Sequence, residues 1–155
     1  ISMNKNHHHL LERIDQIIEK HTSRERCLAE ISQVLAETFS TFDWVGFYLV
    51  DETQKDELVL GPYVGDPTEH TNIAFGQGIC GQAAATKTTF VVEDVNQEDN
   101  YLSCSPNVKS EIVVPIFKET DIVGELDIDS HTIDAFTEED RAFLENVCRQ
   151  LTVLF

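Results

Sequence analysis

The stretch that decides the fold is residues 110–130, which read SEIVVPIFKETDIVGELDIDS. Apolar and polar side chains alternate on both sides of a short polar turn, and this two-residue period is typical of half-buried β-strands. We therefore predict two strands, at 111–117 and 122–129, that pair antiparallel. Each strand has one apolar or small face, and the opposite face carries the acidic side chains, which are Glu111, Glu125, Asp127 and Asp129.

Elements on both sides of this stretch extend the same pattern. Residues 44–50 (WVGFYLV) and 57–63 predict a β-hairpin, and 90–92 predict a further short strand. Apolar residues at helical spacing predict helices at 7–19, 23–39, 79–86 and 138–154. Because strands that are adjacent in sequence are joined by short turns, we expect an α+β fold with a central, largely antiparallel sheet.

The length of 155 residues fits one domain with a single core. We assign residues 7–155 to this domain and interpret residues 1–6 as a tag remnant and flexible start. The three adjacent histidines at 7–9 permit metal binding, but a run this short near a terminus is more typical of a mobile tail.

The charge and the cysteines narrow the class of protein. A formal net charge of −17 disfavours binding to nucleic acid or to an anionic membrane surface, since both need basic patches. No apolar run approaches the ~20 residues of a membrane span and no secretory signal is visible, so we expect a cytoplasmic protein. There the four cysteines are expected to be free or redox-active thiols. Cys27 and Cys148 fall on the apolar stripes of predicted helices and are expected in the core.

Trp44 and Tyr48 share one face of the 44–50 strand, where exposed aromatic side chains would be unusual. Either this face and the acidic faces of the later strands are solvated, or the long segment 61–109 covers them. A covered face that mixes aromatic and acidic side chains is typical of a polar small-molecule pocket. The pattern alone leaves both interpretations open.

Four motifs in the chain carry a family resemblance. They are WVGFYL at 44–49, FGQGICGQA at 75–83, Cys104 followed by SEIVVP at 110–115, and LDIDS at 126–130. In this order they resemble the free methionine-(R)-sulfoxide reductases, which are stand-alone GAF-domain enzymes. The similarity runs from about residue 25 to the C-terminus. It implies a GAF-like domain whose antiparallel sheet has helices packed on one face and a ligand pocket on the other.

The resemblance also implies an activity and its partners. The family reduces the R-epimer of free methionine sulfoxide, is recycled by thioredoxin and forms a homodimer through its terminal helices. Its cysteine motifs fall here on Cys80 and Cys104, which we expect to be catalytic; we expect no metal and no other cofactor. Its substrate-binding residues match two aromatic side chains and three carboxylates, namely Trp44, Tyr48, Glu111, Asp127 and Asp129. One departure is His70, which stands where the family usually carries a third, often resolving, cysteine.

The expected reaction is thiol chemistry. The Cys104 thiolate attacks the sulfoxide sulfur, methionine leaves, and the cysteine becomes a sulfenic acid. Cys80 then condenses with it to a disulfide, which an external dithiol reduces. Cys80 follows a glycine-rich turn at the start of a predicted helix, where the helix N-terminus favours a thiolate. The alternatives are that Cys80 fills a tight gap beside Gly78 and Gly81, and that Cys104 is an inert loop thiol.

The carboxyl groups offer acid–base chemistry. Asp127 and Asp129 lie two residues apart on one strand face, and their repulsion in an enclosed site should raise one pKa. A neutral carboxyl would donate a hydrogen bond to the sulfoxide oxygen. An ionised carboxyl would hold the substrate ammonium, with Trp44 placed for a cation–π contact. Glu111 fits either role.

His70 leaves three readings open. It is a surface-loop histidine, a base or cation that activates Cys104, or a zinc ligand together with Cys80 and Cys104. Because the usual third cysteine is absent, a second hypothesis for the whole chain is a non-catalytic GAF module that binds a small amino-acid-like ligand. A third hypothesis is a structural dimer without a ligand.

Overall fold

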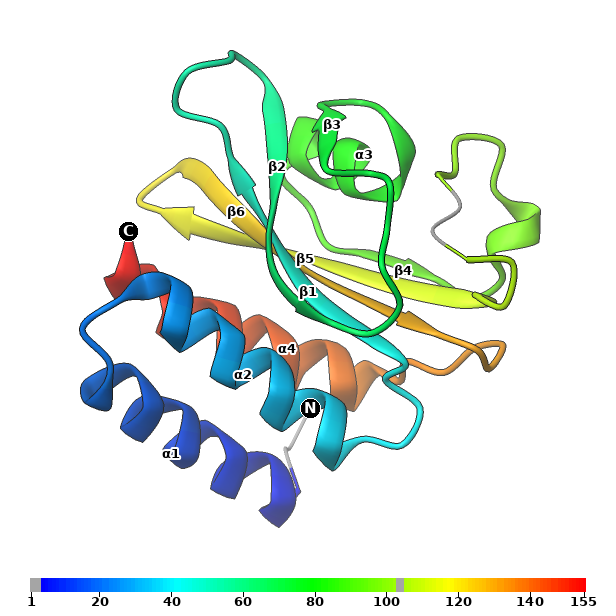
Figure 1. The fold of residues 1–155 in the computed structure, drawn as a ribbon. Helices are drawn as coiled ribbons and strands as arrows, with labels where there is room; N and C mark the ends of the chain where they lie inside the picture. The colour runs from blue at the N-terminus through cyan, green and yellow to red at the C-terminus, as the bar shows by residue number, and fades with distance from the viewer. Residues whose placement is uncertain (1–3, 103–104) are drawn as a thin grey trace.

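The computed structural model describes residues 4–102 and 105–155 (Figure 1). In chain order the elements are α1 (Lys5–Lys20), α2 (Arg24–Thr38), β1 (Trp44–Val50), β2 (Glu57–Val64), β3 (Asn72–Ala74), α3 (Gly78–Thr86), β4 (Phe90–Val92), β5 (Ser110–Lys118), β6 (Asp121–Ser130) and α4 (Glu138–Leu151). Short 3₁₀ turns follow β4 at Val95–Gln97 and α4 at Thr152–Leu154. Every predicted helix and strand is present, with its ends within three residues of the predicted ones.

The strands form one sheet in the order β3-β2-β1-β6-β5-β4, and every pair is antiparallel. The β1–β2 hairpin and the β5–β6 hairpin join through the pairing of β1 with β6. Strand β3 pairs with the start of β2 and is absent from the prediction, because three residues give no readable alternation. The predicted α+β class with a central antiparallel sheet is confirmed.

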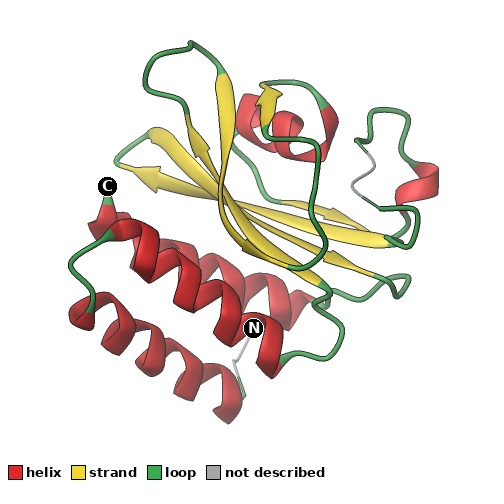
Figure 2. Ribbon diagram, viewed as in Figure 1, coloured by secondary structure: helices red, strands yellow, loops and turns green. Residues whose placement is uncertain are grey.

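Figure 2 shows α2 and α4 against one face of the sheet, with α1 packed on them on the side away from the strands. Beneath the helices lie the apolar strand faces that the alternation predicts, with Val45, Phe47, Ile112, Val114, Ile116, Leu126 and Ile128 all buried. The predicted core cysteines, Cys27 and Cys148, lie in the same cluster. This face of the sheet is therefore the main hydrophobic core of the domain.

The N-terminal helix differs from the expectation. It begins at Lys5, two residues before the predicted domain start, and the Asn4 side chain accepts a hydrogen bond from the His7 backbone N–H. The His7 side chain is buried and its ring stacks on Phe143 of α4, with centroids 4.4 Å apart. The prediction of a mobile tail at residues 7–9 is wrong, because His7 packs between α1 and α4.

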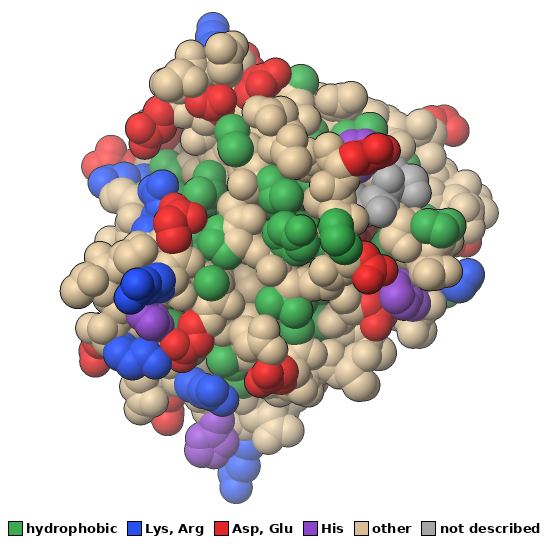
Figure 3. All heavy atoms as spheres, viewed as in Figure 1, with side chains coloured by type: hydrophobic (Ala, Val, Ile, Leu, Met, Phe, Trp, Pro, Cys, Tyr) green, Lys and Arg blue, Asp and Glu red, His purple; other side chains and the backbone are tan. Residues whose placement is uncertain are grey.

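The surface carries both signs of charge. On the face drawn in Figure 3, Lys and Arg side chains lie among Asp and Glu side chains. Lys20 Nζ, for example, lies 2.9 Å from a carboxylate oxygen of Glu30. Across residues 4–102 and 105–155, no helix has both the length and the apolar character that a bilayer crossing requires.

Candidate active site

The second face of the sheet is covered rather than solvated. Figure 1 shows α3 and the chain between β4 and β5 on the side of the sheet opposite α2 and α4. Beneath this cover the predicted aromatic and acidic residues are all buried, with Trp44, Tyr48, Glu111, Asp127 and Asp129 at most 5% exposed. The prediction that this face is covered is confirmed, and the interpretation as a solvated sheet face is wrong.

Strand register places the acids in a row. Strand β6 presents Glu125, Asp127 and Asp129 at alternate positions, so all three point to the covered face. On β5, Glu111 pairs with Asp129, and on β1, Trp44 also pairs with Asp129. The acidic row therefore comes from the β5–β6 hairpin, and Trp44 joins it from a strand far away in sequence.

Glu125 is the functional candidate that the sequence analysis places on the correct face but leaves out of the site. Its side chain is 0% exposed and lies opposite Tyr48 on β1 and Pro115 on β5. Both of its carboxylate oxygens are buried without a hydrogen-bond partner among the described residues. Its alternation with Asp127 and Asp129 was the signal that could have added it to the site.

The two aromatic residues fasten the segment after β2 to the sheet. The Trp44 indole Nε1 donates a hydrogen bond to the backbone oxygen of Asp66 at 3.0 Å. The Tyr48 hydroxyl donates to the backbone oxygen of His70 at 2.8 Å. Gly46, between them on β1, leaves room for the indole, because a Cβ there would lie 2.5 Å from the Trp44 ring. Trp44 and Tyr48 thus form one wall of the site and hold its cover.

Cys80 is brought to the acids by α3. The helix begins at Gly78, which has a φ of 64°, and passes so close to β3 that a Cβ on Gly81 would lie 2.4 Å from the Ala74 carbonyl oxygen. The Cys80 sulfur and one carboxylate oxygen each of Glu111 and Asp127 lie within 4.8 Å of one another. Cys80 therefore lies on a tightly packed helix and, at the same time, close to the acids.

The expectation that the helix N-terminus favours a Cys80 thiolate is wrong. Burial raises the pKa of the Cys80 thiol well above its ordinary value, and the charges of Asp127, Glu125, Glu111 and Asp129 raise it further. The fields of four nearby carboxylates and the loss of solvation outweigh the helix dipole, whose effect is confined to the first turn. Cys80 is a protonated thiol in this closed arrangement.

The acids differ in how far their pKa values move. Burial raises the pKa of Glu111 well above its ordinary value, and the charges of Asp127 and Asp129 add to this. Burial and the charge of Asp127 likewise raise the pKa values of Glu125 and Asp129 well above the ordinary range. Burial raises the pKa of Asp127 too, but hydrogen bonds with Glu111 and Cys80 oppose the rise. All four acids therefore hold protons more readily than exposed carboxyl groups do.

A pocket of about 10 Å³ lies over these groups, lined among others by His70, Cys80, Glu111 and Asp127. This volume suits about one water molecule. His70 is a half-buried loop residue that lines this pocket. The structure thus gathers Tyr48, His70, Cys80 and the acids at one place.

Cys104, the predicted nucleophile, lies outside the described residues. The described residues on either side of it both reach the covered face: Leu102 lines the 10 Å³ pocket, and Ser105 lines a second one beside Trp44 and Asp129. The reading of His70 as a zinc ligand with Cys80 and Cys104 stays open for the same reason.

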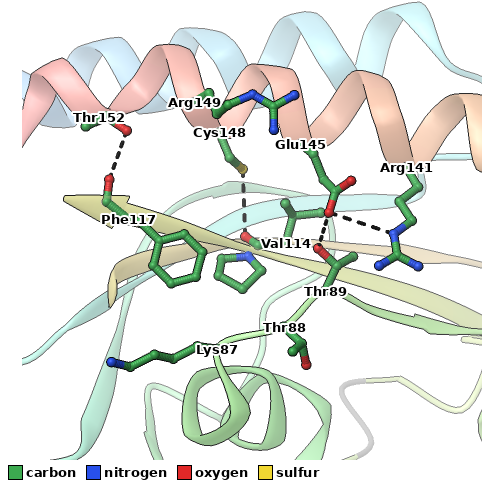
Figure 4. A pocket seen from close by; sticks show the side chains of 11 residues that line it. Lys87, Thr88, Thr89, Val114, Phe117, Arg141, Glu145, Cys148, Arg149 and Thr152 are labelled. Carbon is green, nitrogen blue, oxygen red and sulfur yellow. Dashed lines mark hydrogen bonds and ion pairs between the residues drawn. The ribbon is translucent and has the colours of Figure 1, made fainter. Parts of the chain in front are cut away.

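A larger groove of about 320 Å³ lies between α4 and the end of β5, on the helix side (Figure 4). Its polar contacts are internal to the protein: Glu145 accepts a hydrogen bond from the Thr89 hydroxyl at 2.8 Å and lies 3.8 Å from Arg141. The Cys148 thiol donates to the Val114 backbone oxygen, and burial raises its pKa. Size alone would favour this groove, but it lacks the convergent buried acids that define the site above.

Comparison with known proteins follows this geometry. Residues 21–155 match the GAF domain family. The chain is 37% identical over 150 residues to GAF domain-containing protein A of Dictyostelium discoideum, covering 97% of this chain and 92% of the relative. It is 38% identical over 130 residues to the free methionine-R-sulfoxide reductase of Escherichia coli, covering 84% and 76%. The structure of the Neisseria meningitidis free methionine-R-sulfoxide reductase with its substrate superposes with a TM-score of 0.91, at 39% identity, over 100% of this chain and 93% of that one.

Proposed function

Since the chain belongs to the GAF domain family and, within it, to the free methionine-R-sulfoxide reductases, we propose that it is a thiol-dependent reductase of free L-methionine-(R)-S-oxide. The observation that carries this proposal is the convergence of Cys80 with a buried row of carboxyl groups on the covered face. A pocket rich in acids suits a small ligand with an ammonium group, and an adjacent thiol suits the reduction of a sulfoxide.

In the proposed reaction Cys104 is the nucleophile. Its thiolate attacks the sulfoxide sulfur, the oxygen passes to the cysteine with a proton, and the products are methionine and a Cys104 sulfenic acid. The Cys80 thiol then attacks the sulfenic acid, a disulfide forms, and one water molecule leaves.

The carboxyl groups divide the binding work. Asp127 lies at the middle of the acidic row on β6, so we assign it to the substrate ammonium. Burial raises the pKa values of Glu111 and Asp129, so we assign them to hydrogen bonds with the sulfoxide oxygen, which protonation helps to leave. Trp44 and Tyr48 supply the wall against which the substrate side chain lies. Because the pocket suits about one water molecule, its cover must move before an amino acid binds.

Recycling belongs to the same proposal. An external dithiol, with thioredoxin as the natural candidate, reduces the Cys80–Cys104 disulfide by exchange. His70 stands where the family usually supplies a further cysteine, and its place at the pocket supports a role in activating Cys104. A homodimer formed through the terminal helices and a cytoplasmic location complete the proposal.

One assay tests the proposal. The reduced protein is incubated with free methionine-(R)-S-oxide and either dithiothreitol or thioredoxin with its reductase, and methionine is quantified by chromatography. We expect turnover with both reductants, none with the S-epimer, and none in Cys104→Ser. The matched control is Cys148→Ser, which removes a buried thiol on the other side of the sheet and should leave turnover unchanged.

Three outcomes would count against it. Binding of methionine-(R)-S-oxide without turnover would favour the non-catalytic GAF module. Turnover that survives in Cys104→Ser would remove Cys104 as nucleophile. Turnover with dithiothreitol but not with thioredoxin would overturn the recycling step alone.

A further inference from the structure

The buried acids are incompletely paired among the described residues. Four buried carboxylate oxygens have no hydrogen-bond partner among the described residues. Two belong to Glu125, one to Asp127 and one to Asp129. Neither Lys nor Arg is among the described residues that line the pockets over these acids. Buried carboxyl groups are normally paired, hydrogen-bonded or bound to a metal ion, so this row is incomplete as it stands.

A cluster of acids is not by itself a metal site, but here a thiol completes the set. Cys80 Sγ, an oxygen of Glu111 and an oxygen of Asp127 all lie within 4.8 Å of one another. Glu125 alternates with Asp127 on β6, and both of its buried oxygens lack a hydrogen-bond partner among the described residues, so it is available as a fourth donor. In a tetrahedral zinc site the ligand atoms lie about 3.5 Å apart, so side-chain movements of about 1 Å would close this set around an ion.

The volume of the pocket points in the same direction. A space of about 10 Å³ accommodates one ion but no amino acid. The donor set also selects the ion, because Mg²⁺ and Ca²⁺ prefer ligands made of oxygen alone, whereas a thiolate with carboxylates suits Zn²⁺. The sequence predicts no metal site because the four donors come from three elements, α3, β5 and β6, and match no zinc spacing.

We propose that the closed pocket binds Zn²⁺ through Cys80, Glu111 and Asp127, with Glu125 as the fourth ligand, and that the bound ion excludes the substrate. Binding releases the protons held by the thiol and the carboxyl groups and changes no oxidation state. The ion occupies Glu111 and Asp127, which are assigned above to the substrate, so the two compete. The exclusion of substrate rests on the function proposed above, but the binding of the ion does not.

Ion binding is tested directly with Co²⁺, which reports thiolate coordination by a sulfur-to-cobalt charge-transfer band. We expect the reduced protein to show this band, Cys80→Ser and Cys80→Ala to lose it, and Cys148→Ser to retain it. Glu125→Gln should weaken cobalt binding at least tenfold. The histidines at 7–9 can also bind cobalt, but they give no sulfur band. Circular dichroism confirms that each variant is folded. A band that survives in both Cys80 variants would overturn the site.

Competition is tested without turnover. The Cys104→Ser protein is titrated with free methionine-(R)-S-oxide by calorimetry, once with a chelator and once saturated with Zn²⁺. We expect at least tenfold weaker binding with zinc, restored by the chelator. Equal affinity in both titrations would overturn the exclusion of substrate. Absence of sulfoxide binding even with the chelator would instead defeat the proposed function, and the cobalt band would still decide the metal site.

Discussion

The two faces of one sheet behave as opposites. On β6, Leu126 and Ile128 point toward α2 and α4 into an apolar cluster, while Glu125, Asp127 and Asp129 point to the covered side. Neighbouring residues of a single strand therefore serve a face that stabilises the fold and a face that holds buried carboxyl groups at a cost in stability. Alternation along a strand is what allows one element to do both.

The largest expected effect is a loss of activity from a substitution on the covered face. Asp127→Asn should lower the rate of methionine formation about 10²–10⁴-fold, because it removes the charge assigned to the substrate ammonium and a partner of Glu111 and Cys80. Steady-state kinetics with dithiothreitol measures this. The matched control is Asp121→Asn, at the exposed start of the same strand. A loss of less than about tenfold would contradict the role of Asp127.

The second effect is a loss of stability from a substitution on the helix face. Leu126→Ala, one residue earlier on β6, should lower the free energy of unfolding by about 2–5 kcal/mol, because it leaves a cavity among fully buried side chains. Urea denaturation followed by circular dichroism measures the change. Val153→Ala, at a side chain that is 75% exposed, is the control and should change stability by less than about 0.5 kcal/mol. An equal effect at both positions would show that the helix-side cluster is loosely packed.

The third effect is a gain in stability from a substitution on the covered face. Glu125→Gln should raise the free energy of unfolding by about 1 kcal/mol, because it removes an ionisable group from a buried site where neither oxygen has a hydrogen-bond partner among the described residues. The measurement is urea denaturation in the presence of a chelator, with Asp121→Asn as the surface comparison. A destabilised Glu125→Gln protein would mean that this carboxyl group makes a stabilising contact in solution.

The smallest expected effect is the contribution of one partly exposed ion pair to stability. Hydrogen bonds from His21 and Lys20 lower the pKa of Glu30, at the junction of α1 and α2. The ionised Glu30 therefore stabilises the folded state above its ordinary pKa, and this contribution is lost as the pH falls through the lowered value. Glu30→Gln should cost less than about 1 kcal/mol at neutral pH and nothing in acid. Denaturation curves at several pH values test this, and a difference that grows in acid would refute it.

The sequence predicts the helix face of the sheet almost completely. Apolar alternation in β1, β5 and β6 identifies the core side chains, because burial against helices imposes a pattern that each strand shows by itself. Strand order is different, since β1 pairs with β6 from the far half of the chain. The three residues of β3 and the buried His7 also escape prediction, because both depend on partners supplied by distant segments.

The covered face is predictable in its members but not in its electrostatics. Alternation and the family resemblance select Glu111, Asp127 and Asp129, yet the rise in the pKa of Cys80 follows from the meeting of α3 with three strands. An argument from the helix N-terminus alone predicts a lowered pKa for Cys80, which is the wrong direction, because it includes the helix dipole but not the surrounding carboxylates. Glu125 was left out of the predicted site although its face was read correctly.

The hydrogen bonds of Trp44 and Tyr48 have a kinetic consequence. Each side chain donates to a backbone oxygen 22 positions later in the chain, Trp44 to Asp66 and Tyr48 to His70. The loop at residues 66–70 is therefore attached to β1 at both of its ends. A loop pinned twice detaches as a unit, and an arriving amino acid waits for that event whatever its concentration. The observed association rate should therefore level off at high ligand concentration, at the frequency with which both bonds break together.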